Sequence, residues 1–243
     1  MSTDPEALGS LLCVWAHPDD ETYLSAGLMA DASRAGRQAV CVTATRGEAG
    51  STDLQRWPLE TLASVREQEL KEALAILGTG GVGIEHRWLD YLDGECDKVD
   101  ENEAVAKVSE IIDDVRPDSV LTFGPDGMTG HTDHKAVCEW TTQAFRSVSP
   151  PGAKLYYATT TQEWLDAVMP VFGPFDVFFA GLPSVTAPDD LAIDFELDDE
   201  LMALKIKAVR AQVSQSEAMF EAIGESFFVT SNGREMYVLA AEA

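Results

Sequence analysis

Residue types that can do chemistry gather in two short stretches of this 243-residue chain. The first, "AHPDDE", places His17, Asp19 and Asp20 directly after an apolar run. One Asp is enough to cap a helix N-terminus, so two consecutive Asp preceded by a His exceed that need. Because His17 and Asp20 are three residues apart across a turn, their side chains can converge on one point.

The second stretch, "GPDGMTGHTDHKA" (124–136), holds two more of the four histidines in the chain. His131 and His134 are again three residues apart, and three glycines before Thr132 allow a sharply turned loop. A polar loop that enters a helix capped by Thr132 or Asp133 explains those two residues. It does not explain two histidines, so this stretch is a second candidate for chemistry.

Together the two stretches offer two imidazoles and a carboxylate. Two His and one carboxylate with an open position form a catalytic metal set. Zinc is the first expectation, and the same ligands also suit ferrous iron. Asp19 and His131 are then left beside the metal, where they could transfer protons. The fourth histidine, His86, lies inside a predicted strand and is interpreted as a packed or surface residue rather than a ligand.

Apolar runs and helical periodicities alternate along the chain and predict the elements that must position these residues. The predicted strands are 11–16, 39–45, 84–89, 119–123 and 154–159. The predicted helices are 22–35, 60–77, 101–115, 133–146 and 199–213. This alternation predicts an α/β fold with a mostly parallel sheet, helices on both faces and a smaller, irregular C-terminal part after about residue 160.

In such sheets, ligands bind at the carboxyl ends of the strands. The segments that follow four of the predicted strands are 17–22, 46–58, 90–98 and 124–134, and we expect them to share one edge. Both chemical stretches lie in these segments. The length fits one domain over residues 1–243.

Composition excludes several classes of partner. The chain carries 42 Asp and Glu against 17 Lys and Arg, a net charge of −25. A nucleic acid or an anionic membrane surface would be repelled, because affinity for phosphates comes largely from Lys and Arg. No apolar run reaches the roughly 18 residues needed to span a bilayer. The acidic start lacks the apolar region of a signal peptide, and the four cysteines form no disulfide framework, so we expect a cytoplasmic protein.

The two motifs, in this order, resemble those of the LmbE-like deacetylases. This family includes the N-acetylglucosaminylphosphatidylinositol de-N-acetylases and the deacetylases of mycothiol and bacillithiol biosynthesis. The resemblance extends over most of the chain through four further stretches. They are "TRGEAG" (45–50), "LASVREQE" (62–69), "LDYLDG" (89–94) and "KIKAVRAQVSQS" (205–216).

The resemblance implies a Rossmann-like fold with a zinc site and roles for particular residues. By resemblance, His17, Asp20 and His134 hold the metal and Asp19 is the general base. His131 then stabilises the oxyanion or protonates the leaving amine, and Asp133 orients a histidine. The resemblance further places the substrate beside Arg66 and Asp93. For Arg46, substrate contact and a structural ion pair with Glu48 remain equally open.

Two departures from the family pattern concern the substrate more than the metal. Thr129 stands where the sugar deacetylases often have a tyrosine, and Gln212 lies in the region where the C-terminal helix often has a histidine. The expected substrate is a small acetylated amino sugar. A thiol–sugar conjugate or an antibiotic glycoside is the alternative. Members of the family are often homo-oligomers, so self-association is a further expectation.

Three other functions compete with this interpretation. A non-heme ferrous oxygenase uses the same ligand types, but usually on an all-β scaffold. A nucleotide-binding protein is suggested by "GTGGVG" (78–83), yet a predicted helix precedes this run and a predicted strand follows it, the reverse of the fingerprint. A non-catalytic metal-binding protein would need neither Asp19 nor His131.

Overall fold

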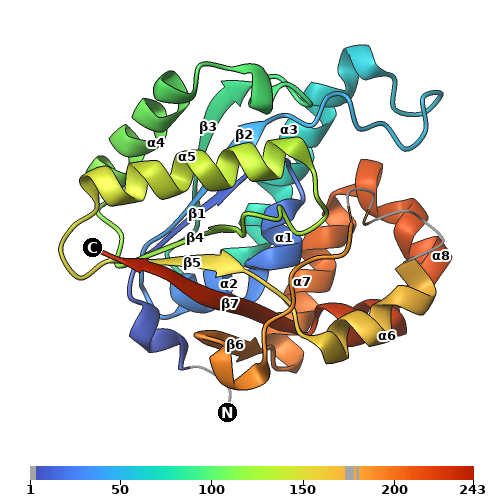
Figure 1. Cartoon of the computed structure of the whole chain (residues 1–243). Coiled ribbons are helices and arrows are strands. Elements are labelled where there is room, and N and C mark those ends of the chain that lie inside the picture. The colour runs from blue at the N-terminus through green and yellow to red at the C-terminus, as the bar shows by residue number, and fades with distance from the viewer. Residues whose placement is uncertain (1–3, 173–177, 179–180) are drawn as a thin grey trace.

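The computed structural model describes residues 4–172, 178 and 181–243. Within them, strands from all along the chain join one sheet. The strands are β1 (Leu11–Trp15), β2 (Ala39–Thr45), β3 (Glu85–Tyr91), β4 (Ser119–Phe123), β5 (Lys154–Ala158), β6 (Ile193–Glu196) and β7 (Arg234–Glu242). Their order across the sheet is β3-β2-β1-β4-β5-β7-β6 (Figure 1).

The five strands β1 to β5 are parallel, and β7 runs antiparallel to both β5 and β6. Every residue of β1, β2 and β4 is buried, which is the pattern of strands covered on both faces. The predicted α/β class with a mostly parallel sheet is therefore confirmed.

Helices cover both faces of the sheet. They are α1 (Asp20–Leu24), α2 (Ala26–Arg34), α3 (Leu59–Leu77), α4 (Glu101–Val115), α5 (Thr132–Val148), α6 (Gln162–Phe172), α7 (Asp199–Ala211) and α8 (Val213–Asn232). Helices α4 and α5 pack together in front of the sheet in Figure 1, and α2, α3 and α7 pack together behind it. None of the helices in the described ranges is long and apolar enough to cross a membrane.

Two features of the fold differ from the sequence prediction. The helix expected over 22–35 is broken at Ser25, whose backbone leaves the helical region (φ −138°, ψ 12°) and whose hydroxyl accepts a hydrogen bond from the Trp15 indole. The region after residue 160 is also more regular than its pattern suggests. Helices α6 and α8 were not predicted, because α6 contains Pro170 and α8 is kinked at Gly224 (φ 73°, ψ 158°).

The glycine run and His86 lie where the sequence analysis placed them. Helix α3 ends at Leu77, Gly78 caps it, and the run leads into β3. This order is the reverse of a dinucleotide-binding turn. The His86 ring packs edge-on against Trp88, and its Nε2 lies 3.0 Å from the Thr43 hydroxyl.

The chain changes direction across the sheet between β1 and β4. Strands β2 and β3 extend to one side of β1, and β4 returns to pair with its other side. Ligands of open α/β sheets bind at such a switch point, outside the carboxyl ends of the strands. The "AHPDDE" stretch leaves β1 there, and the loop that contains His131 leaves β4.

A buried ion pair fixes the N-terminus of α2 to the C-terminal strand. Lys205 and Glu235 are both fully buried, with 3.0 Å between Nζ and Oε1. The Glu235 carboxylate also accepts hydrogen bonds from the backbone N–H groups of Gly27 and Leu28, and Lys205 donates to the Tyr23 carbonyl. Removing one partner of such a pair leaves the other as an uncompensated buried charge.

We therefore expect Glu235→Ala to lower the free energy of unfolding by about 3–5 kcal/mol. Urea denaturation measures this loss. The matched control is Lys154→Ala, which removes an exposed pair with Glu242 and should change stability by less than about 1 kcal/mol. Equal effects of the two variants would show that the buried pair has no special role.

Candidate active site

The atoms of the three predicted metal ligands from the two motifs face one another at the switch point. His17 Nδ1 lies 3.1 Å from His134 Nε2, and His134 Nε2 lies 3.5 Å from Asp20 Oδ1. The other Asp20 oxygen lies 3.7 Å from His17 Nδ1 and accepts the backbone N–H of His17 at 2.7 Å. We refer to these three residues as the ligand triad. All three are buried.

Hydrogen bonds on the far side of each ring orient the two histidines. His134 Nδ1 donates to the Gly127 carbonyl at 2.9 Å, which leaves Nε2 without a proton in the neutral ring, and the ring stacks on Phe123. His17 Nε2 donates to carboxylate oxygens of Asp93 at 3.0 Å and Asp133 at 3.3 Å, so Nδ1 turns toward the triad. Backing of a ligand imidazole by a carboxylate or carbonyl is typical of metal sites.

The triad attracts positive charge. Burial alone would lower the pKa of His17, but the hydrogen bonds to Asp133 and Asp93 raise it to about 10. Burial and the charge of His17 lower the pKa of His134 to about 3. The space between His17 Nδ1 and His134 Nε2 can therefore hold a proton or a metal cation. The adjacent Asp20 carboxylate adds the negative charge that a divalent cation prefers, so these residues fit a metal ion.

His131 lies beside the triad, and its hydrogen bonds place its proton on a different ring nitrogen from that of His134. Its ring centroid is 4.7 Å from that of His17 and 5.1 Å from that of His134. One donor atom of each of the three histidines lies within 4.8 Å of the others, so His131 is close enough to be a ligand. However, its Nδ1 accepts the Asp133 backbone N–H at 3.1 Å. The neutral ring therefore carries its proton on Nε2, which suits a hydrogen-bond donor.

Asp19 is held in an unusual backbone conformation next to the triad. Its φ of 140° lies in a region that L-residues rarely adopt, and such strain persists only where the surroundings enforce it. Its carboxylate lies 3.1 Å from the Arg66 guanidinium. Burial raises the pKa of Asp19 to about 6, against the lowering effect of Arg66. A carboxyl with this pKa is suited to accept a proton near neutral pH.

Arg66 fixes the loop as well as the carboxylate. It also donates to the carbonyls of Gly47 at 2.8 Å and Pro18 at 2.5 Å, and only 3% of its surface is exposed. Gly47 has a φ of 64°, and a Cβ there would lie 2.1 Å from Arg66 Nη1, so only glycine fits. Arg66 is thus part of the wall that holds Asp19.

A second brace reaches the Asp19 loop from the C-terminal helices. Buried Glu21 accepts the Asp19 backbone N–H at 3.0 Å, and the Thr22 hydroxyl donates to the Asp19 carbonyl at 2.8 Å. The Gln212 amide, between α7 and α8, donates to Glu21 at 2.6 Å, and its oxygen lies 2.8 Å from the Thr22 hydroxyl, whose one proton is shared with the Asp19 carbonyl. Gln212 therefore ties both supports of Asp19 together. In the sequence, Gln212 is apparent only as a departure from the family pattern.

We expect Gln212→Ala to lower kcat about ten-fold, because the strained Asp19 backbone loses a support while no ligand atom changes. Steady-state kinetics with metal content per chain would measure the effect. Gln143→Ala is the matched control, since Gln143 bonds only the exposed Glu101 and Glu139 on the surface. A Gln212→Ala protein with the kcat of the control would contradict the brace.

Of the three residues expected to contact substrate, two lie at the site and one does not. Arg66 and Asp93 join the site, but their polar atoms bind Asp19 and His17 respectively. Arg46 does not join it. Its guanidinium lies 2.7 Å from Asp90 and 3.3 Å from Glu67 and stacks on Trp88, so its ion pairs are structural and involve neither Glu48 nor the ligand triad.

Two cavities meet at the triad, since Asp20 and His134 line both. The first, of about 240 Å³, is polar and is lined by His17, Asp19, Asp20, Gly50, Arg66, Asp93, His131, His134 and Gln215. The second, of about 310 Å³, is lined mostly by apolar side chains from α1, β4, α6 and α8. We call them the polar cavity and the apolar cavity.

Comparison with known proteins places this geometry in a family. The family model described as GlcNAc-PI de-N-acetylase (PIG-L) matches residues 12–145, which include both motifs. The chain belongs to the PIG-L family. A curated relative in Mycolicibacterium vanbaalenii, a 1D-myo-inositol 2-acetamido-2-deoxy-alpha-D-glucopyranoside deacetylase, is 31% identical over 265 residues, covering 95% of this chain and 90% of its own.

Solved structures share the fold of this PIG-L protein. An N,N'-diacetylchitobiose deacetylase from Pyrococcus horikoshii superposes with a TM-score of 0.64 at 21% identity, over 95% of this chain and 83% of the other. A 4-carboxy-2-hydroxymuconate hydratase from Pseudomonas putida reaches 0.60 at 14% identity, over 95% of each chain. Because a hydratase has this fold too, the fold alone does not decide the reaction, and the side chains of the site must.

Proposed function

We propose that this PIG-L protein is a metal-dependent N-deacetylase that hydrolyses the acetamide of an N-acetylglucosaminyl-type substrate. The observation that carries the proposal is the ligand triad with a proton acceptor, Asp19, and a hydrogen-bond donor, His131, in the same cavity. Burial raises the pKa of Asp19 to about 6, and the neutral His131 ring carries its proton on Nε2. A non-catalytic metal-binding protein needs neither group. The curated relative, a deacetylase of an acetamido sugar, supports this reaction.

The proposed ligands are His17 Nδ1, an Asp20 carboxylate oxygen and His134 Nε2. Zinc is the first candidate because two His and one carboxylate are a common catalytic zinc set, and ferrous iron binds the same ligand types. When bound, the ion would supply Lewis acidity, polarising the scissile carbonyl and lowering the pKa of water. The other steps belong to the residues of the chain.

Asp19 accepts a proton from the attacking water as the new C–O bond forms. His131 donates a hydrogen bond from Nε2 to the carbonyl oxygen, whose negative charge grows as the tetrahedral species develops. The C–N bond then breaks, and the proton that Asp19 took from the water passes to the departing amine. The products are a carboxylate and a free amino sugar. Arg66, Glu21 and Gln212 hold Asp19 in place during these steps.

The polar cavity is the proposed binding site for the sugar. Its walls carry the polar side chains of Asp19, Arg66, Asp93, His131 and Gln215. Arg66 and Asp93 shape this cavity mainly through the loops and the ligand that they hold. A hydroxyl-rich substrate suits it better than an apolar one.

The test is a panel of N-acetylglucosaminyl compounds assayed for free amine with added zinc or ferrous iron. The panel contains the inositol glycoside, diacetylchitobiose, a thiol–sugar conjugate and an antibiotic glycoside. We expect amine and acetate in equal amounts from at least one compound. Iron-dependent consumption of oxygen with a 2-oxo acid, without amine release, would instead indicate an oxygenase.

A further inference from the structure

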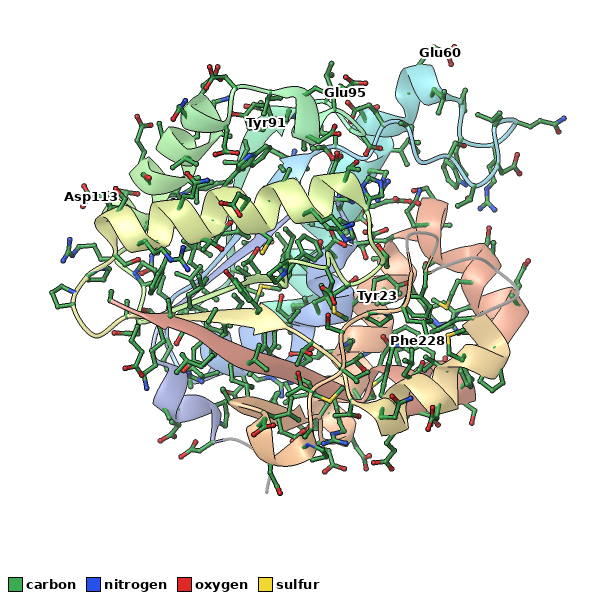
Figure 2. All side chains as sticks on the ribbon, viewed as in Figure 1. Tyr23, Glu60, Tyr91, Glu95, Asp113 and Phe228 are labelled. Carbon is green, nitrogen blue, oxygen red and sulfur yellow. The ribbon has the colours of Figure 1, made fainter. Side chains whose placement is uncertain are left out.

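The apolar cavity has no role in the acetyl hydrolysis proposed above. Six of its larger apolar side chains come from elements far apart in the sequence: Tyr23, Leu24, Phe123, Met128, Met219 and Phe228. Figure 2 labels Tyr23 and Phe228, whose ring centroids are 6.2 Å apart, on the side of the molecule where α6 and α8 lie. Its volume of about 310 Å³ is within the range of roughly 300–1,000 Å³ seen for small-molecule sites.

Charged residues at the cavity wall already have partners. Glu235 pairs with Lys205, and Arg234 holds Asp194 through two nitrogens at 2.6–2.9 Å. Their charges are balanced within the protein, so the cavity is not built for an ionic ligand. The occupant that suits it is an apolar group that enters past His134 and the small side chain of Thr129.

An amide carbonyl carries two substituents, and the site offers two different cavities for them. The scissile carbonyl must sit beside Asp20 and His134, which line both cavities. The amine side of the substrate is a sugar rich in hydroxyl groups, and it matches the polar cavity. The acyl side then faces the apolar cavity, where a methyl group would leave most of the space empty.

We propose that this enzyme prefers N-acyl amino sugars whose acyl chain is longer than acetyl, with the chain bound in the apolar cavity. The inference rests on the proposed amide hydrolysis and extends its substrate class. The reaction is balanced as before: water adds to the acyl carbon, the C–N bond breaks, and a fatty acid and the free amine leave.

The test is kinetic, with methyl glucosaminides that carry N-acetyl, N-butyryl or N-hexanoyl groups. Each buried methylene should raise kcat/KM about four-fold, so the hexanoyl compound, with four more methylenes, should exceed the acetyl compound by about 250-fold. A kcat/KM that stays constant or falls as the acyl chain lengthens would overturn the inference. Amine release from the acetyl compound in the same assay would still support the proposed function. A higher kcat/KM for hexyl N-acetylglucosaminide than for methyl N-acetylglucosaminide, in place of the acyl-chain effect, would also overturn the inference. The apolar cavity would then bind an alkyl chain attached to the sugar.

A binding measurement separates the two proposals if no compound is cleaved. Calorimetry on the Asp19→Ala protein should give a Kd for the N-hexanoyl compound at least ten-fold below that for the N-acetyl compound. Equal affinities would overturn the inference independently of turnover.

Filling the cavity gives a second check. Met219 on α8 lines the cavity and is half-buried. A larger side chain there can extend into the cavity without overpacking the core. Met219→Trp should lower the ratio of hexanoyl to acetyl kcat/KM at least ten-fold. The exposed Leu239 on β7 lies outside the cavity, and Leu239→Trp should keep that ratio. Equal ratios in the two variants would contradict the assignment.

Discussion

Replacing Asp19 with alanine should lower kcat for amide hydrolysis by roughly 10²- to 10⁴-fold, the usual contribution of a general base. The attacking water then has no carboxylate beside it to take its proton. The metal should stay bound at one ion per chain, because the ligand triad uses His17, Asp20 and His134 and none of their ligand atoms belongs to Asp19. Amine-release kinetics and elemental analysis of the same sample measure both quantities.

The control for this variant is Asp97→Ala, which removes an exposed carboxylate outside the site and should keep kcat within two-fold. Loss of the metal in Asp19→Ala would show that Asp19 is a metal ligand and not the general base. An unchanged kcat would show that another group takes the proton.

The second large effect is expected when one of the predicted metal ligands, His134, is removed. We expect His134→Ala to bind less than one tenth of an ion per chain and to show no measurable turnover, because the imidazole that faces His17 Nδ1 at 3.1 Å is gone. The zinc-induced rise in melting temperature expected of the wild-type protein should also disappear, since an ion stabilises only the state that binds it.

The matched control uses the one histidine outside the site. His86 packs on Trp88 and contacts Thr43, so His86→Ala should keep a full metal ion and its activity. Retention of stoichiometric metal by His134→Ala would contradict the ligand triad and would favour His131 as the third ligand.

Much of the fold was predictable because its signals are local. Apolar runs of five to seven residues gave the five parallel strands, and the rule that ligands bind at strand carboxyl ends brought "AHPDDE" and the His131 loop to one edge. The backbone contacts there agree, since Gly94 donates to Asp133 at 2.8 Å and Ala49 donates to Asp93 at 2.9 Å.

The missing parts depend on contacts between distant residues, which leave no periodic signal. Asp93 was predicted to contact substrate, but its hydrogen bond to His17 from a different loop was not foreseen. Gln212 reaches Glu21 across 191 positions of sequence. The apolar cavity forms only when β4, α1 and α8 come together, and the sequence pattern of α8 did not predict a helix.

The central claim is that the ligand triad holds a divalent cation required for amide hydrolysis. Its most direct test is a titration of chelator-treated protein with zinc and, under anaerobic conditions, with ferrous iron. Amine release from the best acetamido sugar of the panel is followed at each addition. We expect no activity without metal and a rise in amine release that reaches its maximum at one equivalent of metal per chain. Full activity in the metal-free protein, or bound metal that restores no amine release, would contradict the central claim.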